Sequence, residues 1–324
     1  IDPGMPHKLT KSLSKVLLET FAIVIINEYD ELHKIKYPEK DIKPKKYMAT
    51  RYLQLQHPGH TGKTSGDGRS IWNGEFKSKG ITWDISSCGT GATCLSPATV
   101  KYGKYFKTGD PSISYGCGYS EVDEGFGSLF FSEVLAKNGI PTERVLAVIS
   151  FKNGFSLTVR ARTNLLRPSH FFNHLKQGHI DSLRHMVDYY IQKQTDNKEW
   201  QDVPKKKLLR YDYFLQRIME NFSWVSAKFE DDYIFCWIDW DGDNILMDGG
   251  IIDYGSVRQF GLFHHEYRYD DVERYSTCIK EQKQKSRYIV QTFAQAIDFL
   301  KTGKKKPLQK FSKHKVLKAF DRHF

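Results

Sequence analysis

The chain has 324 residues, 40% apolar and 14% aromatic, and this composition excludes a disordered protein. Its length suffices for one large domain or two lobes with a sizeable core. The formal net charge is +11, but residues 301–324 contain nine Lys/Arg and one Asp, so this tail alone accounts for +8. The remaining body carries only about +3, which argues against a nucleic-acid-binding surface outside the tail.

The chain contains five dispersed cysteines: Cys88, Cys94, Cys117, Cys236 and Cys278. None forms a CxxC pair, so no zinc or thioredoxin-like motif is supported. Dispersed thiols are typical of a reducing, cytoplasmic compartment, and secretion as an effector or organellar import stays open. The apolar run over residues 16–27 is too short for a bilayer, so no transmembrane segment is expected.

Residues 1–46 are interpreted as a tag remnant (residues 1–4), a helix over 10–35 and a Pro-containing linker over 36–46. A strand-rich segment follows over residues 47–162. Its predicted strands are 51–55, 70–76, 81–85, 144–151 and 155–161. Asn153-Gly154 predicts a hairpin turn between the last two strands. A Gly-, Ser- and Tyr-rich loop is expected over 92–125, and one helix over 126–138.

Residues 163–300 are predicted to be mainly helical. The expected helices are 170–175, 180–194, 206–228 and 286–301. The predicted fold class is α+β, with a strand-rich N-lobe containing one helix and a helical C-lobe, as in a two-lobed kinase-like layout.

Residues 301–324 form a basic C-terminal tail. The tail is a candidate to bind an acidic partner, RNA or anionic lipid. Val316, Leu317, Phe320 and Phe324 recur at helical spacing, so a docked amphipathic helix is an alternative. A solvated basic terminus is the favoured interpretation.

The most informative pattern is Asp243-Asn244, followed by eight residues and then Asp253-Tyr254-Gly255. Carboxylate and amide oxygens suit Mg²⁺, which keeps several waters and takes other ligands from phosphates. The intervening residues 245–252 predict two short strands around Gly249-Gly250, which would bring Asn244 and Asp253 to one end of a ribbon. Solvated turns and a metal-free hairpin are the alternatives; an EF-hand fails on its spacing.

Other nucleotide motifs are missing. Residues 59–64 lack the spacing of a Walker loop, and no GxGxxG or GxSxG occurs. Arg160 and Arg167 are candidate phosphate ligands because a guanidinium is planar and permanently charged, although charge alone favours surface ion pairing for both.

These motifs resemble the selenoprotein O (SelO/YdiU) family, protein adenylyltransferases on an atypical kinase fold. Four blocks between about Tyr52 and Ala296 carry the resemblance: Gly59-His60 to Gly66-Asp67-Gly68-Arg69; Ser132-Glu133 with Gly139-Ile140-Pro141-Thr142-Glu143-Arg144; Asp243-Asn244 to Asp253-Tyr254-Gly255; and Arg274-Tyr275-Ser276.

The resemblance implies that ATP and Mg²⁺ or Mn²⁺ bind and that AMP is transferred to Ser, Thr or Tyr hydroxyls of protein substrates. Asp243 would be the catalytic base, and Asn244 and Asp253 would hold the metal. The phosphate-binding residues would be Arg160, Arg167, Gly89 and Gly91.

The chain departs from the family in an ion pair. The family's phosphate-binding Lys precedes a Gly-x-Gly-x-Thr run, and Cys88 stands there in this chain. Its acidic partner falls on Ser128, while Glu121, Asp123 or Glu124 could substitute as the acid. Lys77, Lys79 or Lys104 could replace the base. The loss keeps two alternatives open: a catalytically impaired pseudokinase that acts as a nucleotide-binding module, and a protein kinase.

Overall fold

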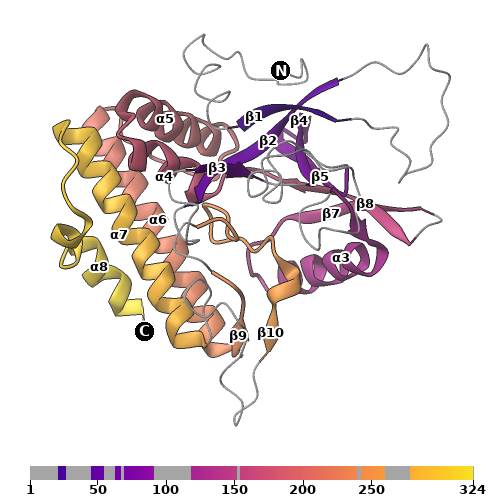
Figure 1. Ribbon diagram of the computed structural model, residues 1–324. Coiled ribbons are helices and arrows are strands. Elements are labelled where there is room, and N and C mark those ends of the chain that lie inside the picture. Colours follow the sequence, from indigo (N-terminus) through magenta and orange to yellow (C-terminus); the bar gives the residue numbers. More distant parts are fainter. Residues whose placement is uncertain are drawn as a thin grey trace. The chain divides into compact units, whose positions relative to one another are not determined.

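A computed structural model describes residues 21–26, 45–54, 63–66, 69–90, 118–151, 154–238, 242–259 and 278–323. The chain divides into two compact units. Unit 1 comprises residues 1–133 and 144–163, and unit 2 comprises residues 134–143 and 164–324. An antiparallel sheet precedes a set of helices, which confirms the predicted α+β class (Figure 1).

Unit 1 is built on an antiparallel sheet. Its strands are β1 (Phe21–Ile26), β2 (Lys45–Gln54), β3 (Lys63–Gly66), β4 (Ser70–Ser78), β5 (Ile81–Cys88), β6 (Ser120–Glu121), β7 (Arg144–Ser150) and β8 (Phe155–Arg162). The strand order is β1-β2-β4-β5-β8-β6, with β3 paired to β2 and β7 paired to β8. Strands β7 and β8 form the predicted hairpin, and Gly154 in its turn has φ +83°.

The register of β5 and β8 sets which side chains share a face of the sheet. Asp84 lies opposite Arg162, Ser86 opposite Arg160, and Cys88 opposite Thr158. Since alternate residues of a strand point to the same side, Arg160 projects from the face that also carries Cys88 and Thr158.

Helix α3 (Val122–Lys137) begins against this sheet. A Cβ on Gly125 would come within 2.8 Å of Ser156 Oγ and of Val148 Cγ1. Only glycine therefore allows the first turn of α3 to approach β7 and β8 so closely. This close approach places Glu124, the preceding residue, beside the sheet.

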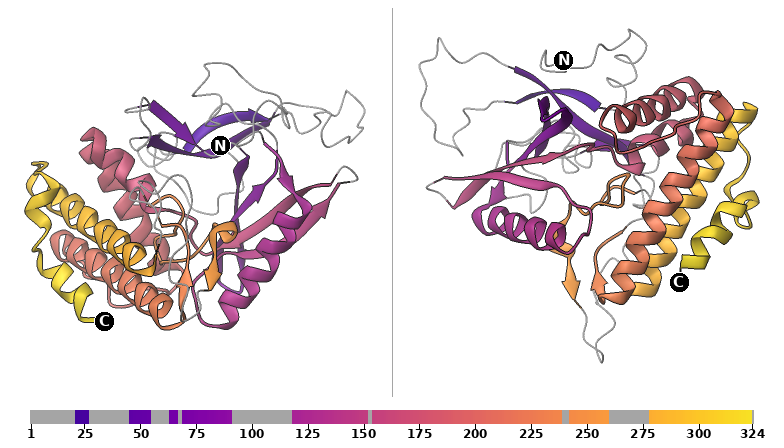
Figure 2. Two further views of the ribbon diagram at one scale, coloured as in Figure 1. Left: turned by 60° about the horizontal axis from the view of Figure 1, so that its bottom comes forward. Right: turned by 180° about the vertical axis from the view of Figure 1, so that it is seen from behind.

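Unit 2 is mainly helical. Its elements are α4 (Pro168–Gln177), α5 (Ile180–Asp196), α6 (Lys207–Asp231), β9 (Ile234–Phe235), η2 (Tyr254–Ser256), β10 (Arg258–Gln259), α7 (Ile279–Thr302), η3 (Leu308–Phe311), α8 (Lys315–Phe320) and η4 (Asp321–His323). The long helices α6 and α7 pack along each other (Figure 2). Phe171, Phe214 and Phe293 meet between α4, α6 and α7 in an aromatic core.

The C-terminal segment is docked. Val316, Leu317 and Phe320 are buried, and α8 packs against α6 and α7. Arg287 of α7 forms an ion pair with Asp321 at 2.7 Å. The structure therefore shows the amphipathic alternative, and the favoured solvated terminus is wrong for residues 308–323. Apolar burial outweighs the mutual repulsion of the lysines, which stay on the exposed side.

Two expectations in the first half need correction. Residues 21–26 form β1, paired with residues 45–50 of β2, so the N-terminal helix over 10–35 is wrong there and the linker ends before Lys45. Residues 120–125 of the expected loop belong to β6 and α3; residues 92–117 lie outside the described part of the chain. No described helix has the length and apolarity needed to cross a membrane.

Candidate functional site

The motif between Asp243 and Asp253 folds into a tight ribbon in unit 2. Ile245 and Ile251 form an antiparallel bridge, and the Leu246 N–H donates to the Gly250 carbonyl at 2.8 Å. Gly249 has φ +82°, which favours glycine and closes the turn. Asn244 precedes the bridge and Asp253 follows it by two residues, so their backbones leave the same end of the ribbon, as predicted.

A second sequence block holds this ribbon. The Ile251 N–H donates to the Pro141 carbonyl at 3.1 Å, and Thr142 pairs with Ile251 in a parallel bridge. The Thr142 hydroxyl lies 2.7 Å from the Tyr254 hydroxyl, and both residues are buried. The Ile140-Pro141-Thr142 block and the Asp-Tyr-Gly block, over a hundred residues apart in sequence, therefore form one piece of structure.

Asp243 is a buried carboxylate that accepts from Arg167 and Ser169. Arg167 Nη1 donates to Asp243 Oδ1 at 3.1 Å and to its main-chain carbonyl at 3.0 Å. The Ser169 hydroxyl donates to the same Oδ1 at 3.4 Å. Pro168 at the first position of α4 starts the helix here, and its two neighbours in the sequence, Arg167 and Ser169, both donate to Asp243 Oδ1.

His170 fixes the same helix start. Its Nδ1 accepts the Arg167 main-chain N–H at 3.1 Å, which requires a neutral ring. Burial, with the charges of Arg167 and His174, holds the pKa of His170 well below its usual value. The imidazole therefore stays neutral and orients Arg167, the residue that binds Asp243.

Asn244 and Asp253 are partly exposed, and their amide and carboxylate oxygens fit a hard divalent cation. Asp253 lies near the buried Cys236 thiol: burial and this carboxylate both raise the thiol pKa. Among the described residues, no three His, Cys, Asp or Glu side chains form a metal-binding group. Two protein oxygens suit a cation whose other ligands are phosphates and water.

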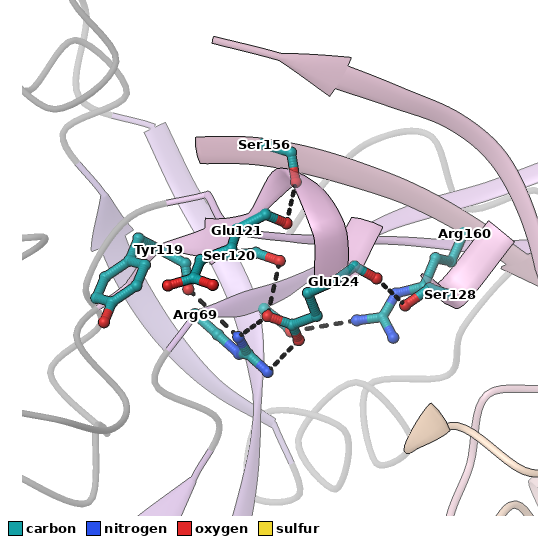
Figure 3. Close-up of polar contacts among 9 residues, drawn as sticks. Arg69, Tyr119, Ser120, Glu121, Glu124, Ser128, Ser156 and Arg160 are labelled. Atoms are coloured by element: carbon teal, nitrogen blue, oxygen red, sulfur yellow. Dashed lines mark hydrogen bonds and ion pairs between the residues drawn. The ribbon is translucent and has the colours of Figure 1, made fainter. Parts of the chain in front are cut away.

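A second polar cluster lies in unit 1 (Figure 3). Arg69 Nη1 donates to Glu124 Oε2 at 2.7 Å and Nη2 donates to Oε1 at 2.6 Å, which is a bidentate ion pair. The Ser120 hydroxyl donates to Glu124 Oε2 at 3.1 Å. The Arg160 side chain points toward the Glu124 carboxylate in Figure 3, and its Nη2 lies 3.5 Å from Ser70 Oγ.

The backbone of Arg69 joins this cluster to the turn after β5. The Arg69 carbonyl accepts the N–H groups of Gly89 at 2.9 Å and of Thr90 at 3.2 Å. Gly89 has φ +85°, and a Cβ there would lie 2.3 Å from the Ser156 carbonyl oxygen. Only glycine can therefore occupy position 89 in this turn. Gly91 lies outside the described residues.

The positions that replace the expected ion pair carry no charge. Cys88 is buried in β5, and the Ser128 hydroxyl donates to the Glu124 carbonyl one turn earlier in α3 at 2.9 Å. Of the three acids considered as substitutes, Glu124 is the one that the structure pairs with a described cation, and that cation is Arg69. Arg274-Tyr275-Ser276 lies outside the described residues.

Comparison with known proteins adds a distant relationship. Proteins called protein nucleotidyltransferase YdiU match the chain: that of Shewanella oneidensis is 24% identical over 235 residues, covering 68% of this chain and 43% of the relative. The protein from Shewanella frigidimarina is 31% identical over 156 residues, covering 45% and 28%, and that from Teredinibacter turnerae is 24% identical over 233 residues, covering 68% and 42%. The chain is a distant relative of the YdiU proteins.

This relationship confirms the resemblance that the motifs indicated. The chain spans less than half the length of the YdiU relatives that it matches. No protein-family model matches it. A crystal structure of a thermostable mutant of aminoglycoside phosphotransferase APH(4)-Ia aligns over 85% of this chain and 94% of its own, at 10% identity and a TM-score of 0.21, a likeness too weak to carry any argument.

Proposed function

We propose that this chain binds ATP with Mg²⁺ or Mn²⁺ and transfers AMP to Ser, Thr or Tyr hydroxyls of protein substrates, on a two-lobed kinase-like fold. The main support for the proposal is the Asp243 carboxylate, which Arg167 and Ser169 orient. It lies at the end of the ribbon where Asn244 and Asp253 also lie. The similarity to proteins named protein nucleotidyltransferase supports the same reaction class.

Each residue has a proposed role that its surroundings support. Asp243 accepts the proton of the attacking hydroxyl, since a fixed carboxylate is a suitable general base. Arg167 and Arg160 bind phosphate oxygens, and the Gly89 turn with Gly91 offers backbone to the phosphates. Asn244 and Asp253 hold the cation, which when bound neutralises phosphate charge.

Parallel reactions with α-³²P-ATP and γ-³²P-ATP test the proposal. Protein labelling from the α position alone is the expected result. Asp253→Ala and Asp243→Asn should each lose most of the label, roughly 100-fold or more.

Asp248→Asn is the matched control. Asp248 lies in the same ribbon, and its Oδ1 accepts the Gly250 N–H at 2.8 Å, a bond that an Asn side chain can also make. This control should label like the wild type. Full labelling by Asp253→Ala would refute the metal assignment.

The uncharged Cys88 and Ser128 favour a second candidate, a pseudokinase that binds nucleotide without efficient transfer. Saturable ATP binding without label from either position would establish this candidate. Label from the γ position alone would instead establish a protein kinase.

A further inference from the structure

We infer that Glu124 is a positioning residue of the nucleotide site: its carboxylate aligns the Arg69 guanidinium to receive the phosphates of ATP. This inference rests on the proposed function. The Arg69–Glu124 ion pair would take the part of the expected Lys–Glu pair, whose two positions are occupied here by the uncharged Cys88 and Ser128.

Geometry supports the alignment of Arg69. Two parallel N–H···O contacts of 2.7 and 2.6 Å fix the plane of its guanidinium as well as its position. The Glu124 carboxylate is itself fixed, because it accepts from Ser120 at 3.1 Å and stands in the first turn of α3, where negative charge is favourable. Gly125, which has no Cβ, lets that turn pack closely against the sheet.

The charges of the cluster require the carboxylate. Arg69 and Arg160 come from different segments of unit 1, and Figure 3 shows both guanidiniums directed at Glu124. Two guanidiniums directed at one carboxylate repel each other, and the negative charge of Glu124 offsets that repulsion. Without Glu124 the Arg69 guanidinium would lose the two contacts that fix its plane, whereas Arg160 would keep its contact with Ser70.

The surroundings indicate an anionic ligand of the phosphate type. The Arg69 carbonyl accepts the N–H groups of Gly89 and Thr90, so the backbone of the paired arginine is bonded directly to the left-handed glycine turn. Guanidinium groups next to such a turn are suited to phosphate oxygens. Arg69 is 32% and Glu124 41% exposed, so the pair is accessible to a ligand.

Glu133 provides a matched control on the same helix. Arg144 donates to it through two nitrogens at 2.6–2.9 Å, and its exposure of 50% is close to that of Glu124. Glu124→Gln and Glu133→Gln therefore remove equivalent ion pairs from α3. We expect Glu124→Gln and Arg69→Lys to weaken ATP binding in Mn²⁺ about tenfold by isothermal titration calorimetry, and Glu133→Gln to change it less than about twofold.

A charge exchange separates positioning from folding. The double variant Arg69→Glu with Glu124→Arg restores an ion pair but places a positive charge in the first turn of α3, so the unfolding midpoint should recover only part of the loss caused by Glu124→Arg alone, while ATP binding stays weak. Restored ATP affinity, unchanged affinity in Glu124→Gln, or tighter binding in Glu124→Gln would each overturn the inference. Wild-type protein that binds no ATP would overturn the proposed function, and the inference with it.

Discussion

The buried pair between Arg167 and Asp243 should be worth more than the shorter but exposed pair between Arg144 and Glu133. Unit charges about 4 Å apart attract by about 4 kcal/mol at an effective dielectric constant near 20, and desolvation offsets part of this. The side chains of Arg167 and Asp243 are only 19% and 13% exposed, so we expect a net coupling of roughly 1–3 kcal/mol. The Arg144–Glu133 pair is 42% and 50% exposed and should couple by less than about 1 kcal/mol.

Two double-mutant cycles measure these couplings. One combines Arg167→Met with Asp243→Asn, the other Arg144→Met with Glu133→Gln, and urea unfolding followed by circular dichroism gives each free energy of unfolding. Arg167 also donates to the Asp243 main-chain carbonyl at 3.0 Å. Both variants lacking Arg167 lose this bond, so the cycle cancels it. A larger coupling for the exposed pair would refute the assignment of Asp243 as a carboxylate held by a buried partner.

Three further predictions concern stability. His170 has a depressed pKa in the folded state, so the unfolded chain alone gains its proton below pH 6.5, and stability should fall by about 1.4 kcal/mol between pH 7.5 and 5.5; His170→Gln should flatten this part of the urea-midpoint profile. Gly89→Ala should cost at least about 2 kcal/mol more than Gly80→Ala, since both glycines have positive φ but a Cβ at Gly80 meets nothing within 4 Å. Phe320→Ala should lower the unfolding free energy by about 3–5 kcal/mol, and the exposed Leu208→Ala by less than about 1 kcal/mol, if α8 docks as described.

The helices of unit 2 could be predicted because their sequences carry both a period and a start or stop signal. Pro168 stands at the first position of α4, and Gly178 ends that helix with φ +74°. The β7–β8 hairpin was predictable because the sequence has an Asn-Gly pair at 153–154 between two apolar runs. The ribbon around Gly249-Gly250 follows from two short apolar runs.

The wrong helix prediction near the N-terminus arose from an apolar run that has neither a helical nor a strand periodicity. Residues 21–26, Phe-Ala-Ile-Val-Ile-Ile, form a strand within a segment predicted as helix. Periodicity cannot separate a buried strand from a helix in such a short run, whereas its β-branched residues favour the strand. The first turn of α3 lies in the segment predicted as a loop, because the Gly-rich composition up to Gly125 favours a loop over a helix.

Part of the candidate site could not be read from the sequence. Arg69 and Glu124 are 55 positions apart, and three acids near the start of α3 were equally plausible partners for a cation. Which of these acids faces Arg69 depends on the residue at which α3 begins and on the register of the sheet strands. A sequence motif determines neither. Ser169 and His170 were also missed as partners of the site, although Pro168 marks the helix start that positions them.

The displaced pair changes how the missing lysine is interpreted. Glu124 precedes Ser128 by four residues, so the two lie on one face of α3, one helical turn apart. An alignment with the family therefore shows a lost carboxylate at position 128. In the structure a carboxylate, that of Glu124, lies one turn earlier and pairs with Arg69 from another segment. Arginine suits this role because its fork is held bidentately and stays charged at any physiological pH. The uncharged Cys88 is therefore not sufficient reason to prefer the pseudokinase. Weaker ATP binding by Glu124→Gln would show that the Arg69–Glu124 pair has replaced the family's ion pair, and unchanged binding would show that the ion pair has been lost.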